Sequence, residues 1–354
     1  MSKVCHHEHN ALLRAMSRRD FVELMALAGL LVGCRPIRQM VPATATPAAK
    51  YTIRKYPDGK SRVVRVHYAG SLGSDDTTVV PEVVDQMLDA SITKLTGLDD
   101  PRAAWKALFS PKERVAIKVN TIRNGLFWTH PPLVLAVTER LVAAGVPPEQ
   151  IVIYDRESDE LEGAGYVINK DGTGVRCYGT DLKYTEGWKV AGRDVRLSNI
   201  LLSCDALINM PILKSHVLCG FTFALENHYG TFDRPSAFHD TFDMVRAIAE
   251  LNALPPIKDR TRLIIGDALT VCLKEAASFP YWREAVRGEM IFMSFDPVAL
   301  DAIASQSWGK LVADHGGNPE SATSLANAWL KIAGELNVGT NNPDDMELVE
   351  VGLG

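Results

Sequence analysis

Short runs of β-branched and other apolar residues alternate with longer amphipathic stretches along most of this chain. The short runs predict buried strands, and apolar residues at helical spacing predict helices. Strands are expected at residues 62–67, 115–120, 151–155, 206–209, 263–267 and 290–293, and helices at residues 81–95, 131–144, 220–229, 243–251, 297–308 and 319–336. This alternation is typical of an α/β fold, in which a mixed, mostly parallel sheet is flanked by helices. The domain could be a single lobe, or two lobes with a cleft between them.

Polar residues follow the predicted strands at the end where ligands bind in open α/β sheets. They are Asn120, Asp155, Asn209, Asp267 and Asp296. Taken singly, each of them could simply cap a helix or form a turn. Two or more of them meeting at one pocket would make a ligand site, and we expect such a site at this edge of the sheet.

The beginning of the chain does not follow the α/β pattern. Arg18 and Arg19 precede a short, moderately apolar run that ends at Gly33 and Cys34. Paired arginines before such a run are typical of a twin-arginine signal peptide, and the small residue before the cysteine is typical of a lipobox. The alternative is a buried helix that begins with two arginines. We expect residues 1–34 to be a signal peptide and Cys34 to carry a lipid after cleavage.

This signal predicts where the protein works. The twin-arginine translocon would export it already folded, and the lipid on Cys34 would anchor it in the periplasm or at the outer face of the cytoplasmic membrane. Residues 35–60 begin with a proline-containing stretch that lacks hydrophobic periodicity, so they predict a flexible tether. Residues 61–354 would then form the α/β domain. A cofactor inserted before export and a redox partner at the membrane are both compatible with this route.

Composition narrows the class of protein. The 354 residues are 46% hydrophobic and 23% charged, which is ordinary for a globular protein, and the formal net charge is -5. No run of Lys and Arg interleaved with aromatics occurs, so nucleic-acid binding has no support. Beyond the signal no stretch of 18 apolar residues predicts a membrane span. The remaining cysteines, Cys177, Cys204, Cys219 and Cys272, form no C-x-x-C pair, so there is no iron–sulfur motif.

The segment from residue 214 to residue 239 is the richest in reactive side chains. His216 and His228 could bind a divalent metal or transfer protons, with Glu226 or Asp267 as the carboxylate partner, and His239 is a third candidate metal ligand. The alternative is a loop whose histidines only bond backbone carbonyls.

A second set of residues would bind substrate. Lys118 and Lys214 could hold a negative charge, and Asn120 and His130 stand where strands lead into loops. Gly220 would allow close approach of an anion where a loop enters the predicted helix at 220–229. Together these residues favour a small anionic molecule as the ligand.

Several motifs resemble a known family, the bacterial and archaeal proteins grouped as domain of unknown function 362. The resemblance covers roughly residues 60–310 and rests on motifs at residues 115–120, 129–131, 143–146, 151–155, 204–211, 214–216, 220–222, 227–230 and 296–301. The family name implies no activity. Some members carry ferredoxin-like cysteine clusters, which this chain lacks, so the resemblance does not imply a cluster of its own.

The chain is also faintly similar to the nickel-pincer lactate racemases, two-domain α/β enzymes. His216 and the Gly-Phe-Thr turn at residues 220–222 match their pattern. Where those enzymes place the lysine that holds the pincer cofactor, this chain has Glu226. The pincer linkage is therefore not expected, whereas a histidine–carboxylate metal site at the same place stays open.

Two functions follow from these observations. The first is an exported enzyme, dependent on histidine and carboxylate and in one version on a metal, that acts on a small oxyanionic substrate. The second is a non-catalytic protein that binds a ligand or assists assembly of a membrane redox complex. We favour the enzyme, because the histidines, lysines and carboxylates are concentrated in a few segments.

Overall fold

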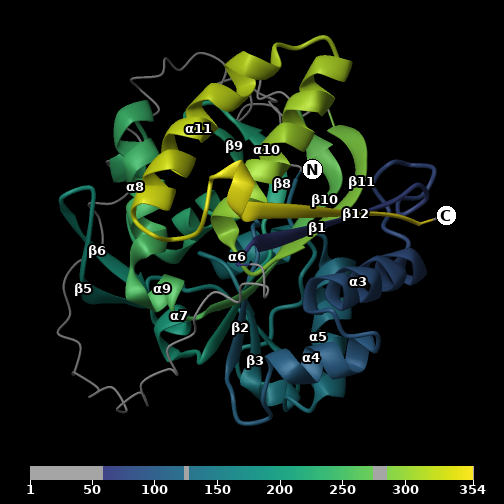
Figure 1. The fold of residues 1–354 in the computed structure, drawn as a ribbon. Coiled ribbons are helices and arrows are strands. Elements are labelled where there is room, and N and C mark those ends of the chain that lie inside the picture. Colours follow the sequence, from purple (N-terminus) through teal and green to yellow (C-terminus); the bar gives the residue numbers. More distant parts are fainter. Residues whose placement is uncertain (1–58, 123–126, 274–284, 354) are drawn as a thin grey trace, which may run out of the picture. The chain divides into compact units, whose positions relative to one another are not determined.

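The computed structural model describes residues 59–122, 127–273 and 285–353 (Figure 1). Within them one ten-stranded sheet has the order β12-β1-β11-β10-β7-β2-β3-β4, with β8 paired to β10 and β9 paired to β8. Its strands are β1 (Ser61–Tyr68), β2 (Val115–Lys118), β3 (Ile151–Tyr154), β4 (Arg176–Cys177), β7 (Ala206–Asn209), β8 (Ile212–His216), β9 (Gly220–Thr222), β10 (Thr261–Cys272), β11 (Ala285–Ser294) and β12 (Met346–Leu353). A separate hairpin consists of β5 (Tyr184–Val190) and β6 (Arg193–Ser198).

The sheet is mixed and mostly parallel. Strands β4, β3, β2, β7, β10 and β8 run parallel to their neighbours in this group, and β1 runs parallel to β12. Strand β11 is antiparallel to both β1 and β10, and β9 is antiparallel to β8. The predicted α/β fold, with a mostly parallel sheet flanked by helices, is confirmed.

Helices cover both faces of this sheet. They are α3 (Pro81–Thr96), α4 (Pro101–Leu108), α5 (Pro131–Ala144), α6 (Ser158–Gly163), α7 (Asn199–Ser203), α8 (Thr241–Ala253), α9 (Pro255–Lys258), α10 (Pro297–Asp314) and α11 (Pro319–Glu335). Alternate residues of a strand enter two different cores: Ala116 packs with residues of α8, α10 and α11, whereas Val115 and Ile117 pack with residues of α3, α4 and α5. Because both faces are covered, the central strands are apolar throughout rather than alternating.

The helix expected at residues 220–229 is wrong. Gly220–Thr222 forms β9, which pairs with β8, and Glu226–Thr231 forms a 3-10 helix. Phe221 and Phe223 are both fully buried, a spacing of two residues that suits a strand rather than a helix. The carboxylate of Asp301 accepts hydrogen bonds from the backbone N–H groups of Ala224 and Leu225, which fixes the turn between β9 and the 3-10 helix.

The structure also bears on the other predicted elements, on membrane spans and on the cysteines. The other predicted helices and the predicted strands are present, with α10, β10 and β11 longer than the sequence indicated. The sequence did not predict strands β4, β5, β6, β8 and β12 or helices α4, α6, α7 and α9. The predicted signal peptide at 1–34, with Arg18, Arg19 and Cys34, lies outside the described residues, as does most of the predicted tether. Among the described residues, no helix has the length and apolar character needed to cross a membrane. The cysteines Cys177, Cys204, Cys219 and Cys272 are buried and are not joined in disulfides.

The contact between Gly266 and Phe223 gives a test of the fold. A Cβ atom on Gly266 would lie 2.2 Å from the Phe223 ring, which also packs edge-on against Phe292 at a centroid distance of 5.7 Å. We expect Gly266→Ala to lower the free energy of unfolding by about 1–3 kcal/mol, because the core must shift to admit a methyl group. Urea unfolding measures this. Gly163→Ala is the control, since nothing lies within 4 Å of a Cβ there, and equal effects of the two variants would contradict the prediction.

Candidate functional site

Polar side chains meet at one edge of the sheet, where the parallel strands end, and we take this cluster as the candidate site. Lys118 is the last residue of β2 and Asn209 the last residue of β7, while Asp155 directly follows β3. All three side chains are buried. The parallel pairing of β3, β2 and β7 brings these polar residues to one edge of the sheet.

Lys118 and Asp155 form a buried ion pair. Lys118 Nζ lies 2.7 Å from Asp155 Oδ1, and the two side chains are 1% and 6% exposed. Lys118 Nζ also donates to the Val119 carbonyl oxygen at 2.6 Å. Asp155 Oδ2 accepts hydrogen bonds from Thr121 N and Thr121 Oγ1, and Asp155 Oδ1 accepts one from Arg156 N. Each charge therefore has a partner that offsets part of its desolvation.

Asn227 attaches the 3-10 helix to the strand ends. Its Oδ1 accepts from Lys118 Nζ at 3.4 Å and from Asn120 Nδ2 at 3.3 Å. Its Nδ2 donates to Asn209 Oδ1 at 2.7 Å and to the Lys118 carbonyl at 3.3 Å. No role was predicted for Asn227 from the sequence. The only signal was its position inside a polar run between two histidines, which does not distinguish a bridging amide from a turn residue.

Lys214 and Glu226 are close to this amide network. Lys214 Nζ donates to Asn120 Oδ1 at 2.8 Å and to the Phe127 carbonyl at 3.4 Å. The residues are 2% and 7% exposed. Burial lowers the pKa of Lys214, and the Glu226 carboxylate partly opposes this. Burial raises the pKa of Glu226, and Lys214 partly opposes that in turn. The protonation state of each group therefore affects the pKa of the other.

His130 and Asp267 form a second buried pair. His130 caps α5 without a side-chain bond to the helix, and its ring is directed instead at β10. His130 Nδ1 lies 2.7 Å from Asp267 Oδ2, which also accepts the His130 backbone N–H at 2.8 Å. His130 Nε2 lies 3.3 Å from Thr270 Oγ1. Burial by itself lowers the pKa of His130, but the charge and hydrogen bond of Asp267 outweigh it and raise that pKa.

The Lys118–Asp155 pair and the His130–Asp267 pair belong to one connected site. Strands β8 and β10 are parallel neighbours, with Ile212 opposite Asp267 and Lys214 opposite Cys272. Asn120, which accepts from Lys214, also exchanges hydrogen bonds with Thr129 through its backbone N–H and carbonyl. Thr129 directly precedes His130. Lys214, Asn120 and the His130–Asp267 pair therefore share one framework of strand ends.

The sequence analysis paired Asp267 with His216 or His228, whereas the structure pairs it with His130. Thr270 was not considered, because a threonine inside a buried strand carries no functional signal in a sequence. Gly220 does not stand at a helix start. It begins β9 with a φ of 93° and lies opposite His216 in the β8–β9 hairpin.

The histidines proposed as metal ligands do not form one ligand set. His216 and His239 lie together, with ring centroids 6.4 Å apart, and His239 stacks on Tyr229 at 6.0 Å. His228 is 1% exposed, and its Nδ1 lies 3.2 Å from Thr231 Oγ1. Across residues 59–122, 127–273 and 285–353, no group of three or more His, Cys, Asp or Glu side chains could hold a metal ion.

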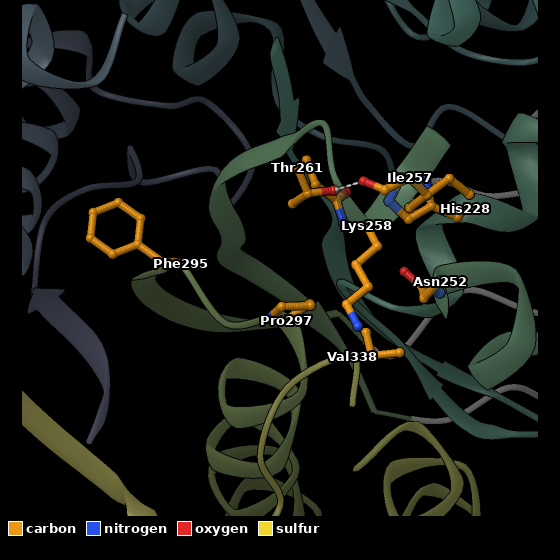
Figure 2. Close-up of a pocket in the computed structure, with 9 residues that line it drawn as sticks. His228, Asn252, Ile257, Lys258, Thr261, Phe295, Pro297 and Val338 are labelled. Carbon is orange, nitrogen blue, oxygen red and sulfur yellow. Dashed lines mark hydrogen bonds between the residues drawn. The ribbon is translucent and has the colours of Figure 1, made fainter. Parts of the chain in front are cut away.

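His228 lines a small pocket that shares Asn209 with the strand-end network. Figure 2 shows its ring close to Ile257 and Lys258, with Asn252 below. The rest of the lining comes from Asn209, Thr261, Phe295, Pro297 and Val338. Burial lowers the pKa of His228 to about 3, and burial together with His239 lowers the pKa of His216 to about 3. Both rings are therefore neutral at physiological pH.

Comparison with known proteins identifies the family to which this chain belongs. The model of the family described as "Domain of unknown function (DUF362)" matches residues 115–306, more than half of the chain and all of the residues that form the connected site. No curated protein matches the sequence.

Two solved structures are similar to parts of the chain. One is a protein from Thermotoga maritima, with TM-score 0.37 and 10% identity over 73% of this chain and 59% of that one. Another is the lactate racemase apoprotein from Thermoanaerobacterium thermosaccharolyticum, with TM-score 0.32 and 11% identity over 66% of this chain and 56% of that one. The chain thus spans less than two thirds of the length of either structure.

The buried ion pair predicts a large stability effect. Asp155→Asn leaves Lys118 as an uncompensated buried charge, so we expect the free energy of unfolding to fall by about 3–5 kcal/mol. The matched control is Asp194→Asn, which removes the carboxylate of an ion pair with Lys189 whose side chains are 68% and 83% exposed. That change should cost at most about 1 kcal/mol. Denaturant unfolding of both variants measures the difference, and similar losses would contradict the assignment.

The His130–Asp267 pair predicts a specific titration. We expect the His130 ring to titrate above 6.5, its ordinary pKa, and below 6.5 in Asp267→Asn, where burial acts without the carboxylate. Because the pKa is raised in the folded state, the stabilisation is fully present below pH 6.5 and is lost as pH rises through the raised value. NMR of labelled histidine rings measures both values. An unchanged His130 pKa in the variant would refute the pairing.

Proposed function

This chain belongs to the family named domain of unknown function 362, and we propose that it is an enzyme in which His130 and Asp267 transfer a proton to or from a small oxyanionic molecule. The observation that carries the proposal is the 2.7 Å contact between His130 Nδ1 and Asp267 Oδ2, with Asp267 fully buried. A histidine held in this way by a carboxylate has one ring nitrogen fixed and the other available for proton transfer.

The geometry supports an acid–base role for His130. Asp267 Oδ2 binds both the ring and the backbone N–H of His130, and Asp267 Oδ1 accepts from Leu269 N, so the carboxylate cannot rotate away. His130 Nε2, next to the hydroxyl of Thr270, is then the atom that exchanges protons. A raised pKa brings the ring closer to neutral pH, where donation and acceptance are both effective.

Lys214 and Asn120 would bind the oxyanion. Lys214 Nζ already donates to the neutral oxygens of Asn120 and Phe127, and a negatively charged oxygen would be a stronger acceptor. Lys118, which the sequence analysis also assigned to substrate binding, has its charge neutralised by Asp155. We therefore assign Lys118 to the framework of the site. The proton transfer proposed here does not depend on His216 and His239, the two candidate metal ligands that lie together.

The proposal includes a location outside the cytoplasm. Arg18, Arg19 and Cys34 would direct the folded protein through the twin-arginine translocon and anchor it by a lipid. The substrate would then be a small anion that reaches the outer face of the membrane or the periplasm.

Proton exchange with solvent tests the proposal. Wild-type protein is incubated in D₂O with a panel of small carboxylates and phosphate esters, and ¹H NMR follows loss of C–H signals and appearance of hydrolysis products. We expect turnover of at least one compound, and a fall of about 10²–10⁴-fold in its rate for His130→Gln and for Asp267→Asn.

The control is His315→Gln, which changes a histidine in an exposed part of the chain and should retain the wild-type rate. Full activity in both site variants would refute the acid–base role. Saturable binding of a panel member without turnover, unaffected by His130→Gln, would favour the non-catalytic alternative, a ligand-binding or assembly protein for a membrane redox complex.

A further inference from the structure

The ring of His130 is held at both nitrogens by residues of one strand, β10. Asp267 Oδ2 lies 2.7 Å from His130 Nδ1, and Thr270 Oγ1 lies 3.3 Å from His130 Nε2. Asp267 and Thr270 are 0% and 4% exposed. Residues three apart in a regular strand point to opposite faces of the sheet. Because these two contact the same ring, β10 is irregular between them.

The packing of β10 shows where the alternation of side chains breaks. Leu269 packs in the core that contains residues of α3, α4 and α5, and Ala268 packs in the core on the other face. Regular alternation would place Val271 with Leu269, but Val271 packs with Ala268. The break therefore lies at Thr270, the residue that reaches His130.

A β-bulge in the neighbouring strand β11 lies at this break. The register of the two strands shifts between Ala268 and Thr270, where two residues of β11, Gly288 and Glu289, stand opposite one residue of β10. Bulges increase the local twist and redirect side chains, and they are over-represented next to active sites. The bulge accounts for the direction of the Thr270 side chain.

The residues of the bulge specify its shape. A Cβ atom on Gly288 would lie 2.2 Å from the Ala268 carbonyl oxygen, so a larger residue does not fit without a shift of the strands. Glu289 has a φ of 52°, in the left-handed region that residues other than glycine rarely adopt. Its Oε1 accepts from Gly70 N at 2.7 Å and from Arg287 Nη2 at 2.8 Å, and these bonds hold the unusual backbone. Backbone strain of this kind is concentrated at functional sites.

We propose that Thr270 is a positioning residue for His130, and that the bulge at Gly288 and Glu289 places its hydroxyl at Nε2. An ionised carboxylate only accepts, so the proton on the Asp267 side stays on Nδ1 and the neutral ring has a lone pair at Nε2. The Thr270 hydroxyl donates to that lone pair, and it accepts from Nε2–H when the ring is protonated. Two contacts fix the orientation of the ring, whereas the Asp267 contact alone would let it rock about the Nδ1 bond.

This inference rests on the proposed acid–base function of His130 and adds the group that orients its reacting nitrogen. At 3.3 Å the contact with Thr270 is long for a hydrogen bond, so it is weak enough to be replaced by a reacting group. The orientation of the ring sets how Nε2 meets the transferred proton, and a misplacement of about 1 Å can cost about 10²-fold in rate.

NMR of ¹⁵N-labelled histidine rings in the full chain tests the contact without any substrate. The His130 signals are assigned by their loss in His130→Gln. At alkaline pH, where the ring is neutral, we expect Nδ1 to carry the proton and Nε2 to show the upfield shift of a hydrogen-bonded acceptor nitrogen. Thr270→Val removes the hydroxyl and should move the Nε2 signal downfield. Thr270→Ser keeps the hydroxyl and should restore the wild-type position.

Two further measurements separate loss of the contact from loss of the fold. In Thr270→Val the His130 pKa should stay above 6.5, because Asp267 is unchanged, and the other histidine signals should keep their positions. Gly288→Ala leaves Thr270 in place chemically but displaces the strands, so its Nε2 signal should move as in Thr270→Val. The control is Gly163→Ala, where nothing lies within 4 Å of a Cβ and wild-type signals are expected.

The outcomes distinguish this proposal from the proposed function. An Nε2 signal at the same position in wild type and Thr270→Val overturns the positioning role, whether or not any compound is turned over. Wild-type signals in Gly288→Ala overturn the role of the bulge. In the D₂O exchange experiment Thr270→Val should lower the rate by about 10–10²-fold at unchanged KM, with recovery in Thr270→Ser. Full exchange activity in His130→Gln would instead overturn the acid–base function.

Discussion

The contact between Lys118 and Asp155 is the interaction that orders the strand ends, because two charges buried this deeply must stay together. Residues next to the ion pair leave room for it or form hydrogen bonds with it. A Cβ atom on Gly230 would lie 2.4 Å from Asp155 Oδ1 and 2.7 Å from Lys118 Nζ, so only glycine lets the end of the 3-10 helix pass this close. Thr121 supplies a backbone N–H and a hydroxyl to the other carboxylate oxygen. The ion pair thus constrains a loop after β2 and a helix that lies more than 100 residues later in the sequence.

The ion pair also constrains where the 3-10 helix and its side chains lie. Asn227 can bridge Lys118, Asn120 and Asn209 only if the 3-10 helix sits against the strand ends, and Glu226 directly precedes Asn227 in that helix. In the same helix His228 lines a small pocket together with Ile257, Lys258 and Asn252 (Figure 2). Adjacent residues of one short helix therefore make different contacts: Asn227 bonds the strand ends, whereas His228 lies beside Thr231 while His216 and His239 lie together.

Which parts of this site could be predicted depends on how far apart in the sequence the interacting residues lie. The apolar runs identify the central strands, and parallel strands bring their ends to one edge, so the meeting of Asn120, Asp155 and Asn209 was predictable. The β8–β9 hairpin was not predictable, because the sequence around Gly220 fits a helix start equally well. The turn after β9 is fixed by Asp301, which lies 77 residues after its partner Ala224. The same holds for His130: a partner 137 residues away on β10 leaves no local pattern.

Charge placement explains how the surroundings of the two lysines differ. Removing water from an ammonium costs several kcal/mol, and a carboxylate in contact repays part of that cost only for the charged form. Asp155 does this for Lys118, which then acts as a fixed positive charge within the site. Burial and the charge of Lys118 both lower the pKa of Lys214, and the Glu226 carboxylate opposes part of this effect. The two lysines therefore have different electrostatic surroundings, because Asp155 contacts Lys118 directly, whereas Glu226 opposes only part of the effect of burial on Lys214.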